Sequence, residues 1–573
     1  MLPERRRSLA LVDFLRTPRG AWTALGIAMA LSGALILATA HGESFDIDEI
    51  FYLGRLVQDS GHIVQHHSLS LEYLLAPYNG HLQLGGKLIY EATFAVAGPS
   101  YVAFELVNIA ALCACAGLVF ELTRRRVGAL TALAPCVLLL FLGFAREVLL
   151  WPFDLHTLVS LAFGLGALLV LQRDDRRGDV LACILITLSI ATIEVGIALL
   201  VGIAVSILLQ PGRLRRAWVF LVPAALYAAW WIWAHRFHQD QSAIELSNVT
   251  LIPKTVFYSL ATVLGSLTGT NPVIPATYIT TVTWFGRGLA VLAAIALAVR
   301  LKRGAIPRTL WVWLAVIVFY WVLMGAAARP PEGSRYVFVG AVGVLLVAAE
   351  AMAGRISGRV TASVFVIVAL ALPANIAQLR SGRENDALHH DAPVSRTEFA
   401  MIELARGRVD PDYVASDDPN VTAIGGGLFI GLPAGAYLRA VERNGSPAFS
   451  LEELRRQPEE LRRIADNTLV DALDLKTEYA PAPATREGCR LVPVEPGTGD
   501  ATFTMPPGGA LLRASGEHWA EIWLRRFATD IHSASRGRIP PRRWVKLAIP
   551  PDAAPDRWEA TIGAALTVCS TGG

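Results

Sequence analysis

The sequence predicts an α-helical polytopic membrane protein followed by a soluble C-terminal domain of mixed α/β or β-sandwich-like structure. Of its 573 residues, 53% are hydrophobic and only 17% are charged, which is too apolar for a soluble domain of this length. About eleven apolar runs approach the roughly 20 residues that a helix needs to cross a bilayer. The segment after residue 378 has no such run and is rich in Pro, Gly and charge.

The apolar runs divide the first two thirds of the chain into a cytoplasmic N-terminus, residues 1–20, and a transmembrane domain, residues 21–378. Residues 179–210 form one apolar stretch that only Glu194 interrupts, so either one long span or two short spans is compatible with it. Counted as two, the predicted spans lie near residues 21–40, 100–122, 128–144, 154–172, 179–193, 195–210, 217–235, 286–301, 309–328, 336–353 and 360–378.

Basic residues decide between one span and two, because cytoplasmic loops collect Lys and Arg. Two spans give about eleven in total and place every basic cluster on the cytoplasmic side, whereas a single span would reverse all later loops. We therefore predict a multi-pass protein of the cell (plasma or inner) membrane with an extracytoplasmic C-terminal domain, and the predominance of Arg over Lys is typical of a GC-rich bacterial gene. The clusters are Arg5–Arg7, Arg124–Arg126, Arg173–Arg177, Arg213–Arg216, Arg300–Arg308 and Arg355–Arg359.

Three external segments are long enough to hold a site: residues 41–99, 236–285 and 379–573. The last begins with an amphipathic helical pattern, SLEELRRQPEELRRIADNTL, and later contains the strand-like runs RWVKLAIPPD and WEATIGAALTVC. Cys489 and Cys569 lie in this domain and could pair in an oxidising compartment, although spacing alone does not prove contact. The other four cysteines fall inside predicted spans.

Several function classes lack support in the sequence. It contains no P-loop, no GxGxxG after a strand, no GxSxG elbow and no Cys/His grouping with zinc spacing. We therefore predict neither soluble nucleotide chemistry nor nucleic-acid binding. His62, His66 and His67 form a loose group to which we assign no metal.

Three acidic residues follow the first predicted span in the motif GESFDIDEIFYLG: Asp46, Asp48 and Glu49. If a helix begins here, Asp48, Tyr52 and Arg55 share one face, and the helix N-terminus stabilises Asp48 as the anion that a general base must be. Asp46 and Glu49 also have capping-box spacing, so the acids have an equally physical interpretation as helix-starting residues. Clustered carboxylates would suit Mg²⁺ or Mn²⁺, but we do not assign a metal site.

Later in the same external segment, His81 and Lys87 precede an amphipathic stretch predicted to lie in the membrane interface. A cation there would bind a lipid phosphate, or, in the case of Lys87, extend to the interface without a specific partner. In the outer turn FAREVLLWPFDLH, Glu147 is a candidate binding residue, with pairing to Arg146 or another Arg as the alternative. Trp151 in this turn is interpreted as an interfacial aromatic anchor.

Two arginines, Arg329 and Arg335, lie in the outer turn AARPPEGSRYVFVG, where the positive-inside bias predicts few cations. Guanidinium groups bind phosphate oxygens bidentately, so Arg335 and Tyr336 are candidates for a phosphate site. An Arg that bonds loop carbonyls is the competing interpretation. Glu194, in a short outer turn between two apolar helices, is a candidate for the same cavity.

These features resemble the GT-C superfamily of membrane glycosyltransferases, which includes protein O-mannosyltransferases, aminoarabinose transferases and actinobacterial arabinosyltransferases. The likeness covers roughly residues 20–378. Asp48-Glu49, followed by Phe51 and Tyr52, resembles the Asp-Glu pair after the first helix of that superfamily. The stretch NGHLQLGGKLIYEATFAVAGPSYVAFELVN resembles its second interfacial helix, and SRY, residues 334–336, resembles its Arg-Tyr pair.

One departure concerns the Lys-Pro-Pro type element of several branches, which is replaced here by Asn79, Gly80 and His81. This replacement weakens the phosphate-binding role that the resemblance would give to His81 and Lys87. The C-terminal domain shows no resemblance that we can name.

The resemblance implies transfer of a sugar from a polyprenyl-phosphate donor to a hydroxyl of a glycan, lipid or protein acceptor on the outer face of the membrane. Asp48 would be the general base, with Glu49 beside it, and some branches of the superfamily also use a divalent cation. The phosphate would be neutralised by Arg335, with Arg329, His81 or Lys87. The sugar would be oriented by Glu49, Glu147 or Glu194, and the implied site also includes Asp46, Tyr52 and Tyr336.

Two other functions fit a polytopic chain. A transporter or flippase of lipid-linked glycans is favoured by charges in the middle of helices or by internal repeats, and neither is evident. A non-catalytic cell-envelope scaffold would use its outer domain to bind glycan or protein.

Overall fold

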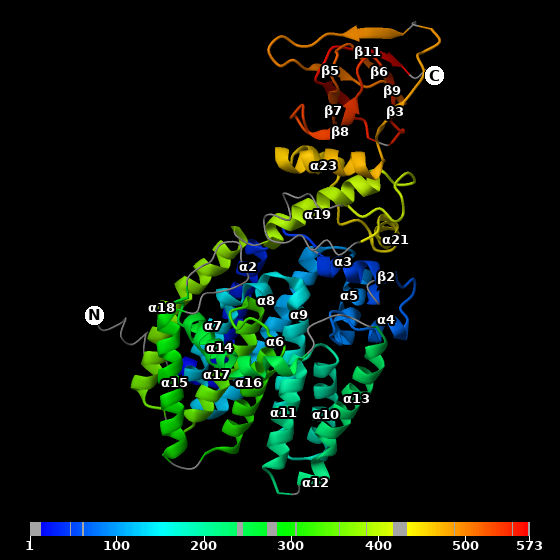
Figure 1. The fold of residues 1–573 in the computed structure, drawn as a ribbon. Coiled ribbons are helices and arrows are strands. Elements are labelled where there is room, and N and C mark those ends of the chain that lie inside the picture. The colour runs from blue at the N-terminus through cyan, green and yellow to red at the C-terminus, as the bar shows by residue number, and fades with distance from the viewer. Residues whose placement is uncertain are drawn as a thin grey trace, which may run out of the picture. The chain divides into compact units, whose positions relative to one another are not determined.

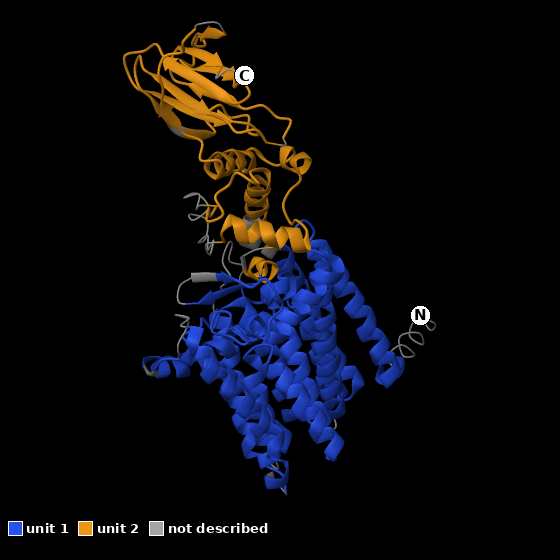
Figure 2. Cartoon of the chain, turned by 90° about the vertical axis from the view of Figure 1, so that its right-hand side faces the viewer, with its two compact units in different colours: residues 1–42, 55–387 blue, residues 43–54, 388–573 orange. Residues whose placement is uncertain are grey.

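The computed structural model describes residues 13–45, 47–59, 62–211, 213–237, 244–271, 283–303, 306–354, 356–384, 387–415, 432–485, 488–552 and 554–570. The chain forms two compact units (Figure 2). Unit 1 comprises Met1–Gly42 and Arg55–Ala387, and unit 2 comprises Glu43–Gly54 and Leu388–Gly573. The division differs from the predicted boundary after residue 378, because the last long helix continues to Glu384 and because part of the first external segment belongs to unit 2.

Unit 1 is a helical bundle, and the predicted class of fold is confirmed. Nine helices of the described residues are long and apolar enough to cross a membrane, or ten if Ala129–Leu140 and Gly143–Leu150 form one bent span. Each predicted span coincides with a helix or with this bent pair. The helices are α2 (Pro18–Thr39), α6 (Tyr101–Val127), α7 (Ala129–Leu140) with η1 (Gly143–Ala145) and α8 (Arg146–Leu150), η2 (Pro152–Asp154) with α9 (Leu155–Leu171), α10 (Arg176–Ile190), α11 (Val195–Leu208), α13 (Trp218–Ala234) with η3 (His235–Phe237), α15 (Trp284–Lys302), α16 (Arg308–Ala326), α17 (Ser334–Ala351) and α18 (Gly358–Glu384).

The ambiguous stretch at residues 179–210 contains two helices, as predicted. A turn at Ala191–Glu194 separates α10 from α11, and the two helices run side by side (Figure 1). The short helix α12 (Arg213–Arg216) follows α11, and Arg216 donates from Nη2 to Asp179 Oδ1 near the start of α10 over 2.5 Å. The hairpin therefore returns the chain to the end of the bundle at which α10 begins.

Other helices of unit 1 also have arginines at the end of the bundle where α10 begins. Arg126 at the end of α6 donates from Nε to Glu350 Oε1 near the end of α17 over 2.7 Å, and Arg300 of α15 donates to the carbonyl of Ala351 over 2.9 Å. We call the bundle end defined by Arg126, Arg216 and Arg300 the basic end, and the opposite end of the same helices the outer end.

The external segment 236–285 contains a helix that the sequence analysis did not predict. Residues Ser247–Leu267, comprising η4 (Leu246–Leu251) and α14 (Ile252–Leu267), meet the length and hydropathy of a membrane span. Asn248 Nδ2 donates to the carbonyl of Ala326 at the end of α16 over 3.0 Å, while the carbonyl of Ser266 accepts from Asn375 in the second half of α18 over 3.1 Å. Because α16 and α18 both run toward the outer end, α14 has both of its ends in the outer half of the bundle.

The rest of the first external segment folds onto unit 1. A short hairpin pairs β1 (Leu56–Asp59) with β2 (His62–Gln65), and the helices α4 (Leu71–Leu75) and α5 (Leu84–Ala97) follow. The preceding helix, α3 (Ile47–Gly54), belongs to unit 2 and packs against α21 (Ala434–Asn444). There the carbonyl of Leu53 accepts hydrogen bonds from Arg443 over 2.7 Å and from Asn444 over 3.1 Å.

Unit 2 has further helices that the amphipathic pattern predicted in part: α19 (Ala387–Leu404), α22 (Leu451–Arg455) and α23 (Glu459–Ala472). Ser450 and Glu453 form a capping box at the start of α22. On α23, the buried carboxylate of Asp466 accepts hydrogen bonds from three successive backbone N–H groups, those of residues 526–528. This carboxylate fixes α23 to the strands that follow.

Two antiparallel sheets make up the end of unit 2, which confirms a β-rich C-terminal domain. One has the strand order β5-β10-β7-β8 and the other β3-β9-β6-β11-β4. Alternate residues of β6 and β7 are buried, as expected for strands with one face against a core. The strands are β3 (Thr477–Tyr479), β4 (Cys489–Val492), β5 (Ala501–Thr504), β6 (Gly509–Ala514), β7 (Ala520–Arg525), β8 (Ala534–Ile539), β9 (Trp544–Ala548), β10 (Glu559–Ile562) and β11 (Leu566–Ser570).

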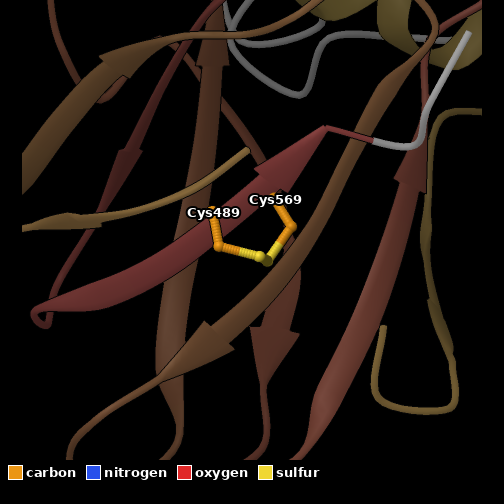
Figure 3. The surroundings of a disulfide bond; sticks show 2 residues. All are labelled: Cys489 and Cys569. Atoms are coloured by element: carbon orange, nitrogen blue, oxygen red, sulfur yellow. A yellow bond between two sulfur atoms is a disulfide. The ribbon is translucent and has the colours of Figure 1, made fainter. Parts of the chain in front are cut away.

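Cys489 and Cys569 form a disulfide between the paired strands β4 and β11 (Figure 3). Cysteine spacing alone leaves this pairing open, and the structure supplies it. Because β4 is the edge strand of its sheet, the bond fastens that edge to the interior strand.

We expect Cys489→Ser with Cys569→Ser to destabilise unit 2, because the bond closes a loop with a sequence separation of 80. In the chain-entropy account such a loop contributes about 4 kcal/mol. Limited proteolysis of the full chain with and without reductant measures the effect. Reductant should accelerate cleavage of unit 2 in the wild type and leave the double variant unchanged, and an equal response of both would contradict the prediction.

Candidate functional site

Ionisable side chains gather at the outer end of unit 1. They come from the first external segment, helix α8, the α10–α11 turn and the start of α17. Helix termini expose backbone groups there, and charged side chains avoid the apolar core of a bilayer. The members that the sequence analysis singled out are His81, Lys87, Glu147, Glu194 and Arg335.

Arg335 and Glu147 form the best-defined pair at this end. Glu147 Oε1 accepts from Nη2 of Arg335 over 2.9 Å and from Nε over 3.2 Å, while Oε2 accepts from the Arg335 backbone N–H over 2.8 Å. The hydroxyl of Ser334 in turn accepts from the Glu147 backbone N–H over 3.2 Å. The Glu147 carboxylate thus both caps α17 and fixes the guanidinium of Arg335. This arrangement agrees with the alternative in which Glu147 pairs with an arginine.

The two partners differ in exposure. The side chain of Glu147 is 2% exposed, whereas that of Arg335 is 38% exposed. The guanidinium lies over the ring of Trp151, with Cζ 5.4 Å from the ring centroid. Trp151 is itself buried, so its predicted role as an interfacial anchor is wrong, and its ring instead lies against the Arg335 guanidinium.

His81 is positioned by a tight turn. Asn79 and Gly80 both have positive φ, 51° and 77°, and Tyr78 and His81 exchange backbone hydrogen bonds of 3.0 and 2.8 Å. Asn-Gly is the residue pair that favours such a turn, because both central positions need left-handed backbone. His81 Nδ1 then lies 2.6 Å from Glu194 Oε1, and both side chains stay partly exposed.

Two glycines let α5 approach the turns between the long helices. A Cβ on Gly85 would lie 2.3 Å from Thr192 Oγ1, and one on Gly86 would lie 1.8 Å from the ring of His156. The Gly85 backbone N–H donates to the carbonyl of Ala191 over 3.0 Å. A larger side chain at either glycine would displace α5 from the end of the bundle.

Lys87 does not lie in either environment that the sequence suggested. Its ammonium is buried and donates to the carbonyls of Tyr73 and Ala76, each over 2.7 Å, which fastens the C-terminal end of α4. Burial lowers the pKa of Lys87 from 10.5 to about 7. Extension to the membrane interface is therefore excluded, and the residue acts as an internal clamp of the first external segment.

Arg55 also differs from expectation. The sequence placed it on one helical face with Asp48 and Tyr52, but α3 ends at Gly54, and Arg55 has a positive φ of 52°. Its guanidinium instead makes a bidentate pair with Glu91 of α5, over 2.6 and 2.5 Å. The hydrogen bond to Glu91 raises the pKa of Arg55 above its usual value.

The predicted acids belong to unit 2. Asp48 and Glu49 occupy the first turn of α3 in unit 2, where Asp48 is half-buried and Glu49 is buried. Tyr52 is buried on the same helix. Asp46 lies outside the described residues, so the three-acid set proposed for a divalent cation is not described as a whole.

Arg329 and Tyr336 lie near Arg335 in the chain and in the fold. Arg329 donates its backbone N–H to the carbonyl of Met324 over 2.8 Å at the end of α16, and Tyr336 is half-buried in the first turn of α17. Within the described ranges of the chain, no three His, Cys, Asp or Glu side chains gather as a metal-binding group would.

Some residues that build the outer end were not predicted. Ser334 and the two glycines Gly85 and Gly86 act through backbone geometry and close packing. The pair of adjacent glycines inside an apolar helical pattern was the one signal that pointed to such packing.

No protein family model matches the sequence, and no curated protein matches it. Two solved structures resemble the fold. One is ArnT from Cupriavidus metallidurans bound to undecaprenyl phosphate, with 13% identity, a TM-score of 0.42 and coverage of 75% of this chain and 90% of that chain. The other is the archaeal oligosaccharyltransferase AglB from Archaeoglobus fulgidus in complex with an inhibitory peptide and a dolichol-phosphate, with 14% identity, a TM-score of 0.40 and coverage of 80% of this chain and 69% of that chain.

We expect Glu147→Gln and Arg335→Gln each to lower the stability of the protein, and the double variant to lose less than the sum of the two. Removing either partner leaves the other without its counter-charge, and contacting residues show coupling of about 0.5 to 3 kcal/mol. Thermal unfolding of the purified protein in detergent measures the cycle. Additive effects would show that the pair contributes no coupling.

The lowered pKa of Lys87 predicts that the free energy of unfolding depends on pH. Between pH 7 and 10.5 the unfolded chain binds more protons at this residue than the folded chain does, so its contribution makes the protein more stable as pH rises through that window. Lys87→Met should remove this part of the slope and loosen α4. Thermal unfolding at a series of pH values, compared with the wild type, tests the sign, and an unchanged slope would assign the dependence to other groups.

Proposed function

We propose that the protein transfers a sugar from a polyprenyl-phosphate donor to an acceptor hydroxyl at the outer face of the membrane. The observation that carries the proposal is the Arg335 guanidinium, which lies at the outer end of a membrane-type helical bundle with one edge held by Glu147 and the rest partly exposed. A fixed and partly exposed guanidinium at this depth suits a phosphate carried by a lipid.

The contacts within unit 1 support different roles for the residues at its outer end. Glu147 is a positioning residue, because three hydrogen bonds to Arg335 occupy its oxygens. His81 and Glu194 form a second, partly exposed pair at the same end, and hydroxyl groups of a sugar are ligands that such a pair can bind. Lys87 supports the segment that carries His81 instead of contacting phosphate.

Asp48 is the proposed general base. In a single displacement its carboxylate accepts the proton of the acceptor hydroxyl as that oxygen bonds to the anomeric carbon. The bond from the anomeric carbon to the phosphate oxygen breaks, and polyprenyl phosphate leaves with the electron pair. Arg335 neutralises the charge that develops on the leaving phosphate. Glu49 is proposed to act beside Asp48, and no step requires a metal.

We also propose the membrane orientation. The basic end of unit 1 faces the cytoplasm, with the N-terminus on that side, and unit 2 lies on the extracytoplasmic side. The charge pattern supports the first assignment, and the disulfide of unit 2 supports the second because disulfides persist in oxidising compartments.

We expect Asp48→Asn to lower transfer from a polyprenyl-phosphate-linked sugar by about 10² to 10⁴-fold, the usual contribution of a general base. Purified protein in detergent or nanodiscs, supplied with candidate lipid-linked sugars, measures the rate. Asp48→Glu, which keeps a carboxylate, should retain more activity than Asp48→Asn.

Glu452→Gln is a matched control, because Glu452 is an exposed acid in the first turn of another helix of unit 2. It should leave the rate unchanged. Full transfer by Asp48→Asn would reject Asp48 as the base, and absence of transfer by the wild type with every donor tested would favour a transporter or scaffold.

A further inference from the structure

A second group of cations lies at the outer end of unit 1, away from Arg335 in the sequence. Arg287, in the first turns of α15, lies against two aromatic rings, with Cζ 4.5 Å from the centroid of Trp284 and 5.0 Å from that of Tyr258. Its Nε is buried, and no described residue accepts the hydrogen of that atom. The two rings thus flank the guanidinium of Arg287.

Lys254, on α14, approaches the same aromatic ring. Its Nζ lies 5.8 Å from the centroid of Tyr258. Two cations from different helices therefore share one ring, and among the described residues neither forms an ion pair within 4.0 Å. Neighbouring like charges repel, so this arrangement is favourable when an anion lies beside both.

The close approach of α14 and α15 is built into the sequence. A Cβ on Gly286 would lie 2.7 Å from the carbonyl oxygen of Ala261, so glycine is needed where the helices touch. This contact lies one residue from Arg287 on one helix and three residues from Tyr258 on the other. The contact therefore brings the backbones that carry Arg287 and Tyr258 close together on two packed helices.

Glu332, in the turn before α17, interacts electrostatically with both cations. Burial raises its pKa, and the charges of Lys254 and Arg287 act in the opposite direction. Arg329 lies in the same turn. The group of described charges therefore keeps a positive excess, which one acid does not offset.

The surroundings indicate a lipid. Trp284 and Phe285, at the start of α15, are 83% and 56% exposed. The other end of α15 lies at the basic end through Arg300, so these aromatics lie at the outer end, where Trp is typical of the membrane interface. We therefore expect an anion that binds Lys254 and Arg287 to carry an apolar group, which would lie against Trp284 and Phe285.

We propose that Lys254 and Arg287 form a binding site for the phosphate of a membrane lipid, with Tyr258 and Trp284 as its aromatic walls. The guanidinium donates to phosphate oxygens from the edge that the rings leave accessible, and the ammonium adds a second charge. The proposal holds whether or not the protein transfers a sugar, because it concerns binding alone. Its ligand class is a lipid phosphate monoester or diester in the outer leaflet.

The test measures lipid binding to the purified full-length protein by native mass spectrometry. The probes are a polyprenyl monophosphate, phosphatidylglycerol, diacylglycerol and inorganic phosphate. We expect the two lipid phosphates to bind more tightly than diacylglycerol or inorganic phosphate, and Lys254→Gln with Arg287→Gln to weaken their binding about 10-fold or more. Preference between the two lipid phosphates identifies the source of the ligand.

Matched variants separate a site from general charge effects. Lys302→Gln with Arg303→Gln removes two exposed cations at the other end of the same helix and should leave binding unchanged. Lys254→Arg with Arg287→Lys keeps both charges and should retain most of the binding, which also controls for folding. The proposal fails if the charge-removing variant binds as the wild type does, if the Lys302 and Arg303 variant weakens binding equally, or if inorganic phosphate alone binds as well as the lipids.

Discussion

The apolar core of a bilayer excludes charged groups, and this constraint determines where the chemistry of unit 1 can lie. Hydrophobic side chains fill the long helices, so ionisable groups collect at the two helix ends. At the basic end they form structural pairs, such as Arg126 with Glu350. At the outer end Arg335 keeps a partly exposed guanidinium beside Glu147, and His81 and Glu194 stay partly exposed. Arg126 has a similar exposed fraction, so exposure alone does not distinguish the two ends.

The outer end is held in place by short-range geometry. The Asn79-Gly80 turn directs His81 toward Glu194, and Gly85 and Gly86 let α5 reach the α9 and α10–α11 turns. Lys87 joins α5 to α4 from inside. These contacts explain how a segment of short strands and helices keeps a defined arrangement beside a helical bundle, and they position the backbones of the candidate binding residues.

The helical part of the fold was predictable because a span needs about 20 apolar residues and because charge distinguishes the two sides. Helix α14 was missed because its buried face carries Ser259, Thr262 and Ser266, which lower its apolar signal. The strand-like runs and the cysteines of unit 2 were recognised, while their pairing required the register of β4 and β11.

The candidate site was predicted less completely than the fold. Charge and position identified Arg335 and Glu147, but sequence spacing does not reveal that one caps and fixes the other across 188 residues. Arg55 and Lys87 were misplaced, because their partners, Glu91 and the carbonyls of α4, come together through tertiary packing.

The segment Glu43–Gly54 lies between two stretches of unit 1 in the chain yet folds with unit 2, where Arg443 and Asn444 hold the carbonyl of Leu53. Residues 388–573 are therefore not an independent domain that engineering can exchange at one junction. A chimera that replaces residues after 388 must also carry a matching α3, and the acids on that helix would be inherited together with the distant domain.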